Sequence, residues 1–157
     1  MGDRLKDRVA IVTGAGSIGP GWGNGKATAV LFAREGAKVF AVDINLEAAE
    51  ETRAIIDGET GECTAHRTDV SKAEEVRDMV ARCVETYGRI DVLHNNVGIL
   101  ALGGCVETSE EDWDHVNDVN LKSMFLTCKY VLPGMIERRK GNIINITSRA
   151  AGRDDVN

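Results

Sequence analysis

The chain has 157 residues, of which 43% are hydrophobic and 28% charged, and its formal net charge is -6. This length and composition predict one globular domain, residues 1–157, with enough apolar side chains for a core. The acidic balance argues against nucleic acid as a partner, because phosphate binding favours a basic surface. No apolar run reaches membrane-spanning length, and the charged N-terminus lacks the apolar core of a signal peptide. We therefore expect a cytoplasmic protein with no membrane partner.

The cysteines contain no closely spaced pair. Metal-ligand spacing is absent, so no metal site is predicted. Reduced, buried thiols are the expected state of cysteines in a cytosolic protein.

Short apolar runs alternate with longer helical patterns along the chain. Strands are predicted at residues 9–12, 38–42, 63–66, 90–93 and 142–146. Helices are predicted over residues 26–35 and 118–138. A capping box at Ser71 predicts a helix that runs to about Tyr87, and a second capping box at residues 108–111 predicts the start of another. Continuous β-branched runs are typical of strands buried on both faces. The alternation predicts an α/β doubly wound (Rossmann) parallel sheet of about five strands.

A glycine-rich loop follows the first predicted strand. Gly14, Gly16 and Gly19 match the dinucleotide-binding fingerprint, whose glycines let the backbone approach a pyrophosphate. Pro20 and Gly21 would disturb a helix that began at Gly19, so the later of the two registers, with a helix start near Gly23-Asn24-Gly25, is predicted. The cofactor-binding candidates in this loop are Gly14, Gly16, Gly23, Asn24 and Gly25.

Asp43 ends the second predicted strand, about 20 residues after the glycine loop. A carboxylate at this position accepts hydrogen bonds from both ribose hydroxyls of an adenosine and repels a 2′-phosphate. The expected coenzyme is therefore NAD rather than NADP. The simpler alternative is that Asp43 only caps the helix that follows.

Five segments together resemble a classical short-chain dehydrogenase/reductase, in order and spacing, over essentially the whole chain. They are Thr13-Gly14 with Gly23-x-Gly25, Asp69-Val70, Asn95-Asn96-Val97-Gly98, Asn120 and Asn145-Ile146-Thr147-Ser148. The resemblance implies an NAD(P)-dependent oxidoreductase that transfers hydride between nicotinamide and a small-molecule alcohol or carbonyl substrate. The glycine loop is longer than is usual in the family, and Val97 stands where alanine is usual.

The resemblance also implies roles for single residues. Asp69, with Val70 beside it, would bind the adenine amino group. The turn from Asn95 and Asn96 to Gly98 would contact the adenosine ribose and steady the central sheet.

Two further roles concern catalysis. Asn120 would hold a water molecule in a proton relay, and Ser148 would stabilise charge on the substrate oxygen. The ordinary alternatives are a surface polar residue for Asn120 and a turn cap for Ser148.

The tyrosine that serves this family as general acid/base, in a Tyr-x-x-x-Lys motif after the serine, is not found up to Asn157. Neither Tyr87 nor Tyr130 begins such a motif. The resemblance therefore implies a domain whose C-terminal part is missing, inactive as a truncated chain, with the strand at 142–146 left as an open edge. The alternatives are a non-catalytic dinucleotide-binding module and, ranked last, a Rossmann-like methyltransferase. The substrate is not predicted, and assembly into a homo-oligomer is left open.

Overall fold

The computed structural model describes residues 2–101 and 103–148. Five parallel strands form one sheet in the order β3-β2-β1-β4-β5, so β1 lies in the middle. The strands are β1 (Val9–Thr13), β2 (Lys38–Asp43), β3 (Glu62–Arg67), β4 (Val92–Asn95) and β5 (Asn142–Asn145). The helices are α1 (Asn24–Arg34), α2 (Leu46–Gly58), α3 (Ala73–Tyr87), α4 (Glu110–Asn117) and α5 (Ser123–Glu137), with a π-helical turn, η1 (Asp118–Lys122), between the last two. The predicted doubly wound sheet is confirmed.

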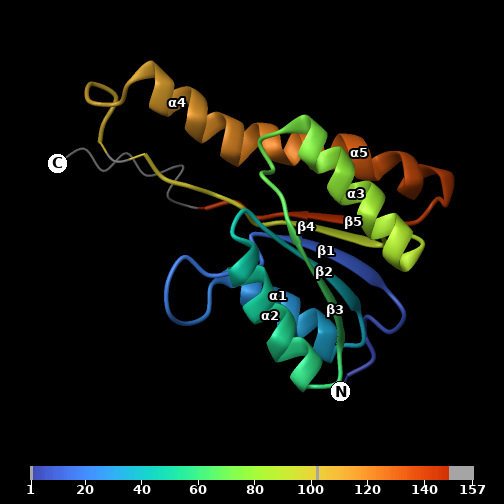
Figure 1. Ribbon diagram of the computed structural model, residues 1–157. Coiled ribbons are helices and arrows are strands. Elements are labelled where there is room, and N and C mark those ends of the chain that lie inside the picture. The colour runs from blue at the N-terminus through green and yellow to red at the C-terminus, as the bar shows by residue number, and fades with distance from the viewer. Residues whose placement is uncertain (1, 102, 149–157) are drawn as a thin grey trace.

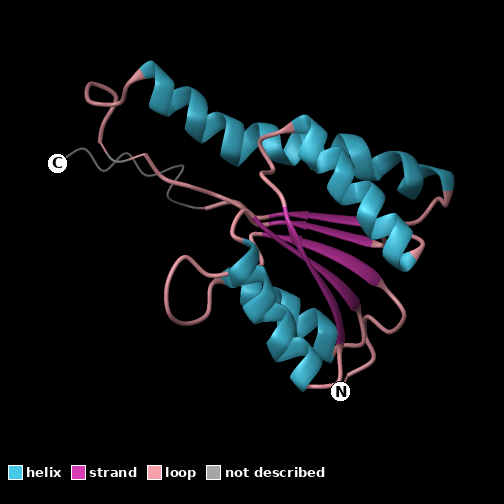
Figure 2. Ribbon diagram, viewed as in Figure 1, coloured by secondary structure: helices cyan, strands magenta, loops and turns pink. Residues whose placement is uncertain are grey.

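Helices cover both faces of the sheet (Figures 1 and 2). Helices α1 and α2 lie on one face, and α3 and α5 lie on the other. Alternate residues of β1, β2 and β4 enter the two cores: Ile11 packs with Phe40 and Leu93 on the α3 side, whereas Val12 packs on the α1 side. Every residue of β1 is buried, as expected for a central parallel strand.

The later of the two registers for the first helix is correct. Helix α1 begins at Asn24 with Gly23 as its N-cap, so Pro20 and Gly21 lie in the loop. A proline removes a backbone donor and fixes φ, which suits a loop better than the interior of a helix.

Both predicted capping boxes were misplaced. The Ser71 hydroxyl donates to Oδ1 of Asp69 instead of capping, and α3 begins after Lys72. For α4 the cap is Ser109, whose Oγ accepts from the amide of Asp112, because the Thr108 hydroxyl is engaged by a carbonyl in the preceding turn. In both places a short-range side-chain hydrogen bond competes with the cap.

The helix predicted over residues 118–138 is part of a longer helical arm. α4 passes through η1 into α5 without a break, and Pro133 lies inside α5. π-helical turns of this kind insert an extra residue into a helix and are frequent at functional sites. The turn contains Asn120, one of the residues singled out in the sequence.

Candidate functional site

A cavity of about 780 Å³ opens at the carboxyl edge of the sheet. Its walls come from the loop between β1 and α1, the end of β2, the segment after β3 and the turn after β4. His115 and Val119 of the helical arm complete its lining. Figure 1 shows the first loop and the segment after β4 leaving the same edge of the sheet, on opposite sides of β1. This is the place where ligands bind in open α/β sheets.

The glycine loop is folded against the first turn of α1 so closely that neither Gly14 nor Gly25 has space for a side chain. Gly14 has φ +64°, a conformation that favours glycine, and a Cβ there would lie 3.1 Å from Nδ2 of Asn96. A Cβ on Gly25 would lie 1.8 Å from the carbonyl oxygen of Gly14. At Gly14 and Gly25 the chain therefore presents bare backbone toward the cavity, as close approach of a phosphate requires.

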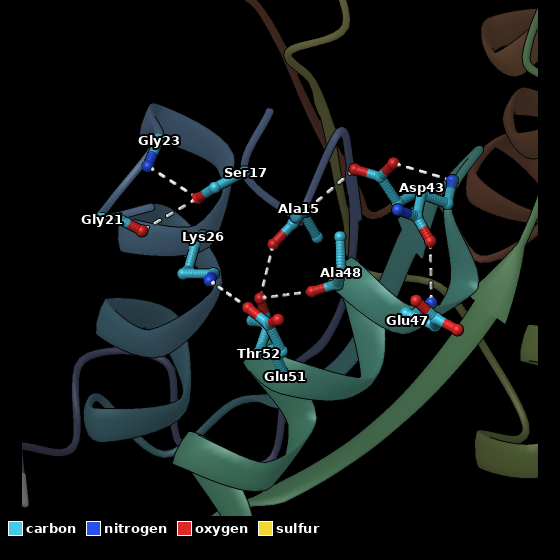
Figure 3. Close-up of polar contacts among 12 residues, drawn as sticks. Ala15, Ser17, Gly21, Gly23, Lys26, Asp43, Glu47, Ala48, Glu51 and Thr52 are labelled. Carbon is cyan, nitrogen blue, oxygen red and sulfur yellow. Dashed lines mark hydrogen bonds and ion pairs between the residues drawn. The ribbon is translucent and has the colours of Figure 1, made fainter. Parts of the chain in front are cut away.

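The N-terminus of α1 fits an anion. Its cap, Gly23, makes no side-chain capping bond, and the first turn contains no acidic residue. The helix dipole and free amides at such an end favour negative charge. The loop ahead of it is closed by Ser17, whose Oγ accepts from the amide of Gly23 and donates to the carbonyl of Gly21 (Figure 3). The residues present thus fit a pyrophosphate.

Asp43 lies at the end of β2, on the wall of the cavity. Its Oδ2 accepts a hydrogen bond of 2.9 Å from the amide of Gly16, and its Oδ1 accepts one of 3.0 Å from the amide of Asn45 (Figure 3). The cap of α2 is Asn45, whose side chain accepts from the amide of Glu47. Asp43 is therefore not the helix cap, and its carboxylate is held beside the glycine loop.

Asp69 and Val70 line the cavity after β3. Oδ1 of Asp69 accepts from both the amide and the hydroxyl of Ser71, at 3.0 and 2.7 Å. Partial burial raises the pKa of the Asp69 carboxyl, but these bonds and the nearby cations Lys72 and Arg67 outweigh it and hold the pKa below its usual range. The group is an anion at neutral pH and can accept a hydrogen bond from an amino group.

Thr68, the residue before Asp69, lines the same cavity. It is 1% exposed, and its hydroxyl oxygen is one of two buried side-chain polar atoms with no hydrogen-bond partner among the described residues. Unsatisfied buried hydroxyls are uncommon in native proteins. A buried hydroxyl without a partner among the described residues, in a residue that lines the cavity, fits a wall that contacts a polar ligand.

The two asparagines at the end of β4 make different contacts. The amide of Asn96 donates to Oγ1 of Thr13 and its side chain donates to the carbonyl of Gly14, so it ties the turn to the glycine loop. Asn95 is buried, donates to Asn145 of β5 and accepts from Thr127 of α5. Asn96 and Gly98 line the cavity, whereas Asn95 is not among its lining residues and braces the sheet against α5.

Asn120 connects the helical arm to the turn after β4. Its Oδ1 accepts from the amide of Ile99 at 2.8 Å, and its Nδ2 donates to the carbonyl of Ile99 at 2.9 Å. This reciprocal pair places the arm against the cavity, whose lining includes Ile99 and Val119. Ser148 lies beyond β5, is exposed and is not among the lining residues.

Several residues of the site escaped the sequence patterns. Thr68, His115, Val119 and Ser17 line the cavity, and Thr52 holds the glycine loop from outside the cavity. Only proximity to Asp69 could have drawn attention to Thr68. A threonine or valine within a helical pattern carries no signal of its own, because the fold alone brings it to the loop.

Two classes of feature are absent from residues 2–101 and 103–148. No group of three or more His, Cys, Asp or Glu side chains could hold a metal ion in this part of the chain. No helix within it has the length and apolar character needed to span a membrane.

Comparison with known proteins identifies the family. The profile of the short chain dehydrogenase family matches residues 8–156. The chain is 41% identical over 145 residues to 3-oxoacyl-(acyl-carrier-protein) reductase FabG of Thermotoga maritima, covering 92% of this chain and 57% of that one. It is 38% identical over 148 residues to D-threitol dehydrogenase of Mycolicibacterium smegmatis, covering 94% and 55%. The chain belongs to the short-chain dehydrogenase family.

Solved structures agree. A crystal structure of a short-chain dehydrogenase/reductase from Burkholderia xenovorans superposes with a TM-score of 0.93 at 46% identity, covering 96% of this chain and 60% of the other. A metagenomic short-chain oxidoreductase in complex with NADP gives 0.85 at 32% identity, covering 92% and 63%. The chain spans a little over half the length of the curated relatives named above. The resemblance inferred from the motifs is confirmed.

Proposed function

We propose that the crevice binds NAD and that the protein transfers hydride between nicotinamide and an alcohol or carbonyl substrate. The observation that carries the proposal is the position of Asp43, a carboxylate held on the cavity wall beside the glycine loop. Ribose hydroxyls donate well to such a group, whereas a 2′-phosphate would bring a second negative charge against it. The NADP bound in the metagenomic relative belongs to that protein.

Different residues of this chain would bind different parts of the coenzyme. The backbone around Gly14, Gly23 and Gly25 would receive the pyrophosphate, and Asp43 would receive the adenosine ribose. Asp69 would accept from the adenine amino group. When bound, the nicotinamide ring supplies the two-electron hydride chemistry.

The substrate end is defined less fully by the cavity. Asn120 would orient the turn after β4 through Ile99, and Ser148 would donate to the substrate oxygen and stabilise charge developing there. Because Ser148 is not among the cavity lining, binding without turnover remains the second candidate function. Oxidation of NADH by a panel of ketones, or reduction of NAD by alcohols, separates the two: binding without turnover of any of them favours the module.

The coenzyme assignment is tested by thermal protection. NADH is expected to raise the melting temperature more than NADPH does, and Asp43→Ala is expected to erode that difference. The matched control is Asp57→Ala, which removes an exposed carboxylate on α2 outside the cavity. Equal protection of the wild-type protein by both coenzymes would contradict the proposal.

A further inference from the structure

Thr52 lies on α2 directly against the glycine loop, with 0% of its surface exposed. Its hydroxyl oxygen is 2.7 Å from the carbonyl oxygen of Ala15 and 3.3 Å from that of Ala48. Helical threonines commonly bond the carbonyl four residues earlier, which here is Ala48. A hydroxyl carries a single proton, and the shorter distance indicates that it is donated mainly to Ala15, outside the helix.

The Ala15 carbonyl and the Gly16 amide are the two ends of one peptide group. The amide end donates to Oδ2 of Asp43 at 2.9 Å. A single peptide group therefore joins the Thr52 hydroxyl to the Asp43 carboxylate. Figure 3 shows the hydrogen bond from Thr52 to Ala15, with Asp43 nearby. Hydrogen bonds in such a chain polarise and orient one another.

Packing restricts the position of this peptide group. A Cβ on Gly16 would lie 2.5 Å from Cβ of Ala48 and 2.9 Å from Oδ2 of Asp43, so the loop is pressed against both α2 and the end of β2. The amide of Ala15 is also fixed, since it donates to the carbonyl of Val42 at 2.9 Å. The remaining freedom is a tilt of the peptide plane, which the Thr52 bond restrains.

We propose that Thr52 is a positioning residue that fixes the carboxylate of Asp43 through the Ala15–Gly16 peptide and thereby sets the preference for NAD over NADP. This inference rests on the proposed function, because Asp43 selects a coenzyme only if the crevice binds one. Thr52 does not line the cavity, so its effect on coenzyme binding is indirect.

The test compares Thr52→Val with Thr52→Ser. Valine keeps the shape and loses the hydroxyl, whereas serine keeps the donor. By the usual net value of one hydrogen bond, Thr52→Val is expected to lower the ratio of NADPH to NADH dissociation constants roughly threefold to tenfold. Thr52→Ser is expected to retain most of the ratio. Thr64→Val is the matched control, since it removes a half-buried hydroxyl that pairs with Tyr87 outside the cavity.

A second readout needs no coenzyme. Hydrogen exchange at the Gly16 amide is expected to quicken in Thr52→Val and in Asp43→Ala, and to stay unchanged in Thr64→Val, with circular dichroism confirming the fold of each variant. If Thr52→Val does not fold, Thr52→Ala against Thr52→Ser supplies the same comparison. In an Asp43→Ala background, Thr52→Val is expected to add no further loss of preference, because both act through one carboxylate.

The outcomes separate the two proposals. An unchanged NADH preference in folded Thr52→Val, with Asp43→Ala losing it, overturns this inference alone. Unchanged Gly16 exchange in Thr52→Val also overturns it. A wild-type protein with no preference for NADH overturns the proposed NAD selection, and the role of Thr52 with it.

Discussion

Two parts of the sheet, which we call its two sides, differ in how the described residues cover them: β1 and β2 form the first side, and β5 with the helical arm forms the second. All of β1 and the interior of β2 are buried between helices on both faces, and the glycine loop, Asp43 and α2 are joined by a continuous set of hydrogen bonds. In β5 only Ile143 is partly buried, and α4 has no buried residue. Apolar side chains are exposed along this second side, among them Phe125, Ile136 and Ile144.

The contrast separates the adenosine end of the proposed site from the residues singled out for chemistry. The proposed adenosine contacts arise from segments that a packed core holds in place, so binding at this end needs little rearrangement. Residues singled out for chemistry, Asn120 and Ser148, lie on or beyond the less covered side. Sites are more precise when rigid elements support them.

The largest expected effect comes from filling the contact between the glycine loop and α1. Gly25→Ala would place a Cβ 1.8 Å from the Gly14 carbonyl oxygen. We expect a loss of about 3 kcal/mol in the free energy of unfolding, because backbone must move to relieve the overlap, and a marked loss of NADH binding. Urea denaturation and coenzyme titration measure the two effects. Gly19→Ala is the control, since a Cβ there meets nothing within 4 Å, and equal behaviour of both variants would contradict the packing.

Asp91 is the main polar tie between the start of β1 and the segment before β4. Its 4% exposed carboxylate accepts from the amide of Val9 and from Arg89. Asp91→Ala is expected to cost about 2 kcal/mol, less than loss of a fully buried pair because Arg89 reaches solvent. Chemical denaturation measures the loss, with the exposed Asp78→Ala as control.

The pH dependence of stability sharpens this prediction. Burial raises the pKa of Asp91, but the Arg89 and Val9 hydrogen bonds outweigh it and hold the pKa below its usual range. A group whose pKa is lower in the folded state stabilises the protein above its unfolded pKa, about 3.9, and loses that effect as the pH falls through the folded value. Asp91→Ala should therefore flatten the acid limb of the stability profile below about pH 4. An unchanged limb would mean that other carboxylates dominate it.

Hydrogen exchange compares the two sides directly. The amides of Ile11 and Val12 in β1 are expected to exchange most slowly, and that of Ile144 in β5 about 100-fold faster, because local opening is easiest where few apolar contacts hold a segment. Residue-resolved exchange by NMR measures the ratio. Equal protection of β1 and β5 would show that the sheet opens as one unit.

The smallest expected effect is at the exposed face of β5. Ile144 is 38% exposed, so Ile144→Thr should change the free energy of unfolding by about 0.5 kcal/mol or less. Leu93→Ala, at a fully buried position in the neighbouring strand, should cost about 3 kcal/mol. Comparable losses at the two positions, measured by urea denaturation, would remove the distinction between the two sides of the sheet.

The five-stranded doubly wound sheet and the start of α1 could be predicted from the sequence, since these follow from apolar periodicity and from the chemistry of proline and glycine. No bounds were predicted for α2. Sequence reasoning missed the continuity of the helical arm, because nothing in the residues around Asp118 marks a π-helical turn. Strand β4 begins two residues later than predicted, although the backbone of Asp91 still bonds both neighbours: its amide donates to the carbonyl of Val9 and its carbonyl accepts from the amide of Asn142.

The site was predicted unevenly for a related reason. Gly14, Asp43 and Asp69 belong to local motifs and line one cavity. Asn95 was expected at the coenzyme, yet its side chain points to Asn145 and Thr127, a direction that only the packing of α5 decides. Residues that act by contact across the fold cannot be read from local spacing.

The most direct test of the central claim is a calorimetric titration with ADP-ribose and with its 2′-phosphorylated form, which carry the adenosine end of the coenzymes without nicotinamide. The account predicts that ADP-ribose binds and that the 2′-phosphate weakens binding at least about tenfold, as repulsion by Asp43 requires. No binding of ADP-ribose at millimolar concentration, or tighter binding of the 2′-phosphorylated form, would contradict it.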